Sequence, residues 1–172
     1  MIPQFLLFMP PLSVPRQTIE SLPNDGIRGK LVWQSGPLTE RDLTIPKGSN
    51  THGTGSMLFK KGLMKDKDQR HYFRDDVFSD LPWVSDTNPS TAHYERATTF
   101  ITLIIDGVDH GSFPFILSHN TKTDSKSYLQ KNSMTNISWG KAQKLIAKDE
   151  LIGKSANLYK SLTTKEYTLE IG

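Results

Sequence analysis

The sequence contains no cysteine in its 172 residues. This absence excludes disulfide bridges, thiolate nucleophiles and zinc sites built on cysteine. A chain without cysteine is typical of a reducing compartment, so we expect a cytoplasmic, bacterial intracellular protein. A chain of this length buries a core large enough to fold without covalent bridges, and we therefore expect one domain over residues 1–172.

Long apolar runs are also missing. No stretch approaches the roughly 20 apolar residues of a membrane-spanning helix, so we expect no membrane association. The opening segment, MIPQFLLFMPPLSVP, lacks the basic region of a secretory signal, and Pro10 and Pro11 interrupt its short apolar run. We interpret residues 4–9 as a first strand.

Common catalytic and metal-binding motifs are absent as well. Gly153-Lys154-Ser155 resembles the end of a phosphate-binding loop, but Lys148 stands where that motif requires its first glycine. The five histidines form no i, i+4 pair and no HExxH motif, and no GxSxG segment supports a hydrolase. The sequence predicts no metal site and no cofactor.

Short apolar runs separated by turn residues dominate the chain, whereas segments with a helical period are few. This pattern predicts a mainly β fold with short helices at residues 53–64 and 138–154. The sequence DGVDHG predicts a hairpin with a loop longer than two residues. The predicted strands are residues 4–9, 29–34, 42–46, 70–78, 97–106, 112–118, 135–139 and 166–171.

The most apolar strands lead into a long polar segment, SHNTKTDSKSYLQKNSMTNISWGKAQK, residues 118–144. Loops beyond about 12–15 residues are most often functional or disordered. Its asparagines, glutamine, lysines and aspartate are the side chains that read base edges, and its hydroxyl groups and lysines can bind phosphates. Between His119 and Lys144 there are five lysines and one acid, which suits a polyanion, although charge alone allows a solvated loop.

A second candidate arm lies upstream in IRGKLVWQSGPLTERD, residues 27–42, whose glycines and basic residues suggest a strand-loop-strand unit. Two arms projecting from one β scaffold could hold a DNA duplex between them. We call residues 28–41 the N-arm and residues 119–136 the C-arm.

Two parts of the chain resemble a known family. KLVWQSGPLTERDLTIPKG, and SHN together with NSMTNISWG, are similar to the C-terminal part of restriction endonucleases of the NgoFVII and BfiI type. There, a phospholipase D-like nuclease domain precedes a B3-like DNA-recognition domain, a seven-stranded pseudobarrel with two DNA-binding arms. The resemblance covers about residues 30–48 and 94–158 and implies the same fold here. Val32 and Ser35 depart from the family pattern, so it does not give the target sequence.

The phospholipase D motif HxK(x4)D occurs nowhere in the chain. We therefore expect the recognition domain alone, a fragment of a larger nuclease, with double-stranded DNA and the nuclease domain of the same parent chain as its partners. The expected activity is sequence-specific binding in the major groove without catalysis.

The expected DNA-binding residues fall into three groups. Phosphate contacts are assigned to Arg28, Lys122, Lys126 and Lys131. Base contacts are assigned to Gln34, Arg41, Asn120, Asp124, Asn132 and Ser133. The other members are Lys30, Trp33, His119, Ser127, Tyr128 and Thr135; of these, Trp33 and Tyr128 also suit packing roles.

Two alternatives remain open. Asp106 followed by Asp124-Ser125-Lys126 matches the D…D-x-K spacing of magnesium-dependent nucleases, although its surroundings are those of a polar loop. The chain could otherwise be a β module in which the polar arm captures a peptide.

Overall fold

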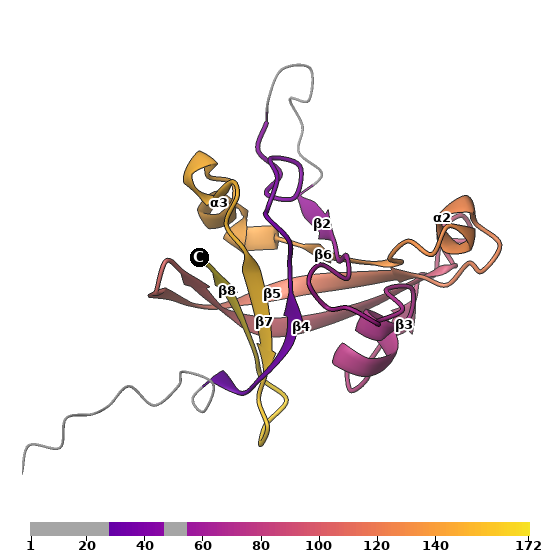
Figure 1. Cartoon of the computed structure of the whole chain (residues 1–172). Helices are drawn as coiled ribbons and strands as arrows, with labels where there is room; N and C mark the ends of the chain where they lie inside the picture. The colour runs from indigo at the N-terminus through magenta and orange to yellow at the C-terminus, as the bar shows by residue number, and fades with distance from the viewer. Residues whose placement is uncertain (1–27, 47–54) are drawn as a thin grey trace, which may run out of the picture.

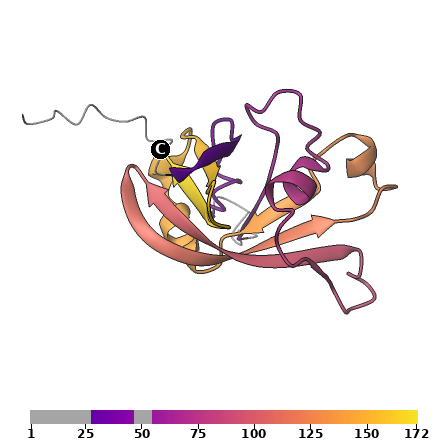
Figure 2. The same cartoon turned by 90° about the horizontal axis from the view of Figure 1, so that it is seen from below.

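The computed structural model describes residues 28–46 and 55–172, and one curled sheet dominates this part of the chain (Figure 1). Seven strands follow one another in the order β1-β7-β8-β4-β5-β6-β2, and β3 pairs with β4 beside this path. Only β4 and β8 run parallel; the other neighbours are antiparallel. The sheet curls into a half-barrel (Figure 2), which confirms the expected mainly β, seven-stranded pseudobarrel.

Short helical segments connect the strands. The strands are β1 (Lys30–Gln34), β2 (Ser56–Leu58), β3 (Val84–Ser85), β4 (Tyr94–Ile105), β5 (Val108–Asn120), β6 (Thr135–Ser138), β7 (Ala156–Lys160) and β8 (Tyr167–Ile171). The helical segments are the π-helix η1 (Tyr72–Val77), α2 (Lys126–Leu129), η2 (Gly140–Ala142), α3 (Gln143–Ile146) and η3 (Asp149–Leu151). The predicted strand at residues 4–9 lies outside the described residues.

The two longest strands, β4 and β5, form a hairpin with a two-residue turn. Asp106 has φ of 49° and Gly107 has φ of 79°, which are typical of a type I′ turn. Because Val108 already pairs with Ile105, the expected longer loop is wrong. The Asp-Gly pair supplies the positive φ angles, so the residues after it are free to continue the strand.

Three further predictions of secondary structure are wrong. Residues 42–46 form a turn, because Thr39 and Asp42 exchange hydrogen bonds between their side chains and backbone N–H groups, as in a capping box. Residues 70–78 contain η1, since Phe73, Val77 and Phe78 are buried at helical spacing. Where a helix was expected at residues 53–64, the described part contains the three-residue strand β2, and buried and exposed residues alternate along it.

The helix expected at residues 138–154 is divided into η2, α3 and η3, with Ala142, Ile146 and Leu151 buried. The predicted apolar face is therefore the buried one, but the helix is not continuous. The strand β7 was missed, although Ala156 and Leu158 alternate with less buried residues.

Aromatic side chains close the half-barrel across its open side. β1 and β2 are the two edge strands of the sheet, yet the rings of Trp33 on β1 and Phe59 just after β2 lie 5.0 Å apart. Phe59 also stacks on Phe73 at 4.8 Å and contacts Phe78 at 5.7 Å, while Phe78 contacts Tyr167 at 5.1 Å. The two edges are thus joined directly by Trp33 and Phe59, and Phe73 of η1 contacts both rings.

This cluster predicts a large difference between two phenylalanines. Phe59→Ala removes a fully buried ring and should lower the free energy of unfolding by about 3–5 kcal/mol in urea denaturation. Phe100→Ala is the control, because that ring is 64% exposed on β4 and its loss should change stability by about 0.5 kcal/mol or less. Equal losses in the two variants would contradict the closure described here.

Candidate nucleic-acid interface

The C-arm is an ordered excursion from the sheet. Its two ends are paired with each other, because His119 on β5 lies opposite Thr135 on β6. Between them the chain forms α2, whose first turn is capped by the Ser125 hydroxyl accepting from the backbone N–H of Tyr128 at 3.2 Å. The arm projects at one end of the long β4–β5 hairpin (Figure 1).

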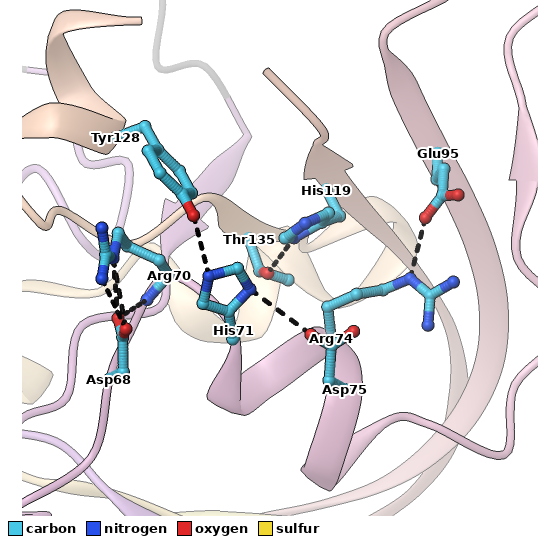
Figure 3. A network of polar contacts seen from close by, with 9 residues as sticks. All are labelled: Asp68, Arg70, His71, Arg74, Asp75, Glu95, His119, Tyr128 and Thr135. Atoms are coloured by element: carbon cyan, nitrogen blue, oxygen red, sulfur yellow. Dashed lines mark hydrogen bonds and ion pairs between the residues drawn. The ribbon is translucent and has the colours of Figure 1, made fainter. Parts of the chain in front are cut away.

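Residues 68–71 hold the C-arm in place, and Figure 3 shows Arg70 and His71 beside Tyr128. The hydroxyl of Tyr128 lies 3.0 Å from Nε2 of His71, and the guanidinium of Arg70 lies 4.6 Å from the centre of the Tyr128 ring. The side-chain amide of Gln69 donates to the carbonyl of Lys131 at 2.8 Å. The position of the arm is therefore set by side-chain contacts to α2 itself and to the residues just after it.

A carboxylate fixes the position of Arg70 in turn. Its guanidinium donates to both oxygens of Asp68, at 2.9 and 2.7 Å. This hydrogen bonding lowers the pKa of Asp68 to about 2, so the carboxylate is charged at any ordinary pH. Arg70 thus stays above the Tyr128 ring as a permanent cation.

The sequence analysis missed a basic segment, residues 60–70, which connects the two arms. It carries five cations and two acids in eleven residues. At one end the carbonyl of Lys60 accepts from the indole of Trp33 in the N-arm at 2.6 Å, and at the other end Gln69 contacts the C-arm. The charge density was visible in the sequence, but part of the segment was assigned to a helix.

Part of this basic segment faces the C-arm across a cavity of about 290 Å³. Lys61, Lys67 and Arg70 line it from the basic segment, and Lys131 lines it from the arm, together with Asp66, Asp68 and Gln69. Four cations against two acids leave this region positively charged.

The N-arm consists of β1 and the start of a turn that is held by side-chain hydrogen bonds. Thr39 and Asp42 close the turn, Leu43 is fully buried, and the indole of Trp139 donates to the carbonyl of Asp42 at 3.2 Å. The turn is therefore anchored in the core while Arg41 projects into solvent.

Several expected DNA-binding residues occupy exposed positions. Arg28 is instead mostly buried in an ion pair with Glu170 on β8, which makes it a poor phosphate ligand. Gln34, Asn120 and Tyr128 are half-buried. The exposed members are Lys30, Arg41, Lys122, Asp124, Lys126, Ser127, Lys131 and Asn132.

Four expected DNA-binding residues are buried: Trp33, His119, Ser133 and Thr135. Nδ1 of His119 lies 2.8 Å from the hydroxyl of Thr135 (Figure 3), and the hydroxyl of Ser133 lies 3.4 Å from the Thr135 carbonyl. Because their side chains are enclosed at the base of the C-arm or in the core, they belong to the scaffold and are not part of the exposed surface.

The carboxylates of the nuclease alternative are far apart. Asp106 lies in the β4–β5 turn and is paired with Lys154, whereas Asp124 and Lys126 lie in the C-arm beyond the other end of β5. A thirteen-residue strand spans about 40 Å. The three residues therefore do not form one site. Within residues 28–46 and 55–172, no group of three His, Asp or Glu side chains is arranged to hold a metal ion.

None of the described helices is long and apolar enough to cross a membrane. Comparison of the chain with protein-family models, curated proteins and solved structures gives no match.

The buried histidine predicts a pH dependence of stability. Burial lowers the pKa of His119 below its usual value. Near pH 6.5 the unfolded chain therefore binds a proton at this histidine more readily than the folded protein does. Stability should therefore fall as the pH decreases from 7.5 to 5.5. The melting temperature of a His119→Gln variant should fall less over this range. Parallel decreases in both proteins would contradict the prediction; Asp68 stays charged throughout and does not contribute.

Proposed function

We propose that the chain is a sequence-specific binding domain for double-stranded DNA, without catalysis of its own. The observation that carries the proposal is the C-arm, an ordered, projecting segment whose three lysines have no carboxylate partner in the described part of the chain. Lys122, Lys126 and Lys131 are all exposed, and the basic segment lies beside Lys131. Cations that are not neutralised within the protein are available to phosphates.

The shape of the arm also supports DNA as the ligand. A helical turn with flanking loops, projecting from a rigid hairpin, is narrow enough to enter the major groove, which is about 12 Å wide. Exposed Asp124 and Asn132 carry the acceptor and amide groups that discriminate base edges. Arg41 of the N-arm is exposed and lines one cavity together with Lys60 of the basic segment, so it adds a second basic contact.

The resemblance to B3-like recognition domains fits this reading. On that basis we propose the target-recognition part of a cytoplasmic restriction endonuclease, in which a nuclease domain of the same parent chain performs cleavage. The outer face of the sheet exposes Phe100 and Ile116, apolar groups suited to such a protein partner.

Lys131 of the C-arm tests the proposed phosphate contacts. Lys131→Gln should weaken binding to all duplexes alike and reduce the slope of log K against log salt by about 0.9, because one phosphate contact is lost. Lys148→Gln, an exposed lysine beside η3, should leave the slope unchanged. A slope near zero in the unmodified protein would overturn DNA binding and favour the peptide module.

Asn132→Ala should behave differently from Lys131→Gln. If Asn132 reads a base edge, its loss costs about 1–3 kcal/mol on the sequence selected from a random pool and leaves binding to random duplexes nearly unchanged. Equilibrium binding to both duplexes, with melting temperatures as the folding control, measures this. A uniform loss on all sequences would assign Asn132 to the phosphate backbone.

The isolated chain should not cut plasmid DNA in the presence of magnesium, because Asp106 and Asp124 lie at opposite ends of the hairpin. Agarose gels with and without the metal check this expectation. Magnesium-dependent cleavage that disappears in Asp124→Ala would establish the nuclease alternative.

A further inference from the structure

A cavity of about 570 Å³ lies between the end of the N-arm and the strands β2 and β6. The turn lines one side with Glu40, Arg41, Asp42, Thr44 and Ile45, and the other side is formed by Ser56, Met57, Leu58, Lys60 and Asn136. Its volume is within the usual range for sites that bind small organic ligands. Asn136 is also the last residue of the C-arm, so the cavity lies where the N-arm and the C-arm join the sheet.

Polar groups around this cavity have unused hydrogen-bonding capacity. The hydroxyl of Thr44 is buried, with the residue 3% exposed, and it has no partner within residues 28–46 and 55–172. A buried hydroxyl without a partner is uncommon in native proteins and requires an explanation. The side-chain amide of Asn136 likewise makes no hydrogen bond with another described residue. The Asn136 side-chain amide and the Thr44 hydroxyl therefore remain available to a ligand.

The backbone at Thr44 is strained as well. Its φ is 56°, in a region that β-branched residues rarely occupy. The Thr39–Asp42 hydrogen bonds and buried Leu43 hold the preceding residues. The turn therefore keeps the hydroxyl in position beside the cavity, although no described group pairs with it.

Several of the lining residues match the parts of a nucleotide. Ile45 and Leu58 provide apolar contact for a flat ring, while the amide of Asn136 and the hydroxyl of Thr44 can pair with ring nitrogens and exocyclic groups. Lys60 lies 3.8 Å from a carboxylate oxygen of Asp42, and Glu40 also lines the cavity, so exposed Arg41 is the cation at the rim that one phosphate can contact. A purely apolar ligand would leave these groups unpaired.

We propose that this cavity binds one nucleotide, received from the bound duplex by turning a base out of the stack. The inference rests on the proposed function, because the duplex delivers the nucleotide between the two arms. The energetic cost of unstacking and unpairing is offset by the hydrogen bonds of Asn136 and Thr44 and by the phosphate contact of Arg41 at the rim. The cavity then recognises the identity of one base, in addition to contacts in the groove.

A fluorescent base reports this directly. A duplex selected from a random pool is prepared with 2-aminopurine at one position at a time, since its fluorescence increases when the base leaves the stack. We expect a several-fold increase at one position when the protein binds. A mismatch at that position should tighten binding about tenfold, because part of the unpairing cost is already met.

Matched variants locate the effect in the cavity. Asn136→Ala should weaken binding of the selected duplex about tenfold and reduce the fluorescence increase, and Leu58→Trp should abolish the increase by filling the space. Ser138→Ala is the control, since Ser138 lies two residues further along the same face of β6 and does not line the cavity. It should bind and respond as the unmodified protein does.

The outcomes separate the cavity from the proposed function. Tight, salt-dependent binding of the duplex without a fluorescence increase at any position overturns the nucleotide cavity and leaves DNA binding intact. Failure to bind any duplex overturns both. Calorimetry with free deoxynucleoside monophosphates distinguishes the source: binding that depends on Asn136, without an extruded base in the duplex, would make the cavity a site for free nucleotides and overturn extrusion.

Discussion

The contact between Trp33 and Phe59 controls the arrangement of both arms. These rings join the two edge strands of the sheet, 5.0 Å apart, where no backbone ladder closes the barrel. The Trp33 indole donates to the carbonyl of Lys60, and the backbone N–H of Phe59 donates to the carbonyl of Thr135 at 2.9 Å. The N-arm, the basic segment and strand β6 at the end of the C-arm therefore meet at Phe59, which is fully buried. Displacement of the Phe59 ring would move all three.

Arginines and lysines have different roles in this surface. Arg28, Arg70 and Arg74 are engaged with Glu170, Asp68 and Glu95, and so contribute to the scaffold, as a planar donor fork suits fixed carboxylate pairs. The lysines of the C-arm have no such partner among the described residues. Because residues 68–71 already hold α2, less conformational entropy is lost when the arm binds a ligand. An ordered arm with unneutralised lysines is thus suited both to affinity and to a defined register.

The long strands, the β4–β5 hairpin and the polar excursion after β5 could be predicted from the sequence, because apolar runs and their interruption are local properties. The turn at residues 42–46 and the π-helix could not, since both depend on specific partners. Thr39 with Asp42 outweighs the strand pattern, and Phe73 is drawn into a cluster with Phe59, a residue distant in sequence. The basic segment was missed for the same reason, because its importance comes from its position between the arms.

The register of two strands decides which polar residues of the C-arm can reach a ligand. His119 pairs with Thr135 and Ser118 with Asn136, and neighbouring residues on a strand point to opposite faces of the sheet. His119 and Thr135 point inward, where Nδ1 and the hydroxyl satisfy each other at 2.8 Å and make burial tolerable. Asn136 consequently points outward, to the cavity beside Arg41. Both faces carry polar residues here, so composition cannot distinguish them; a shift of one residue would bury Asn136 and expose Thr135.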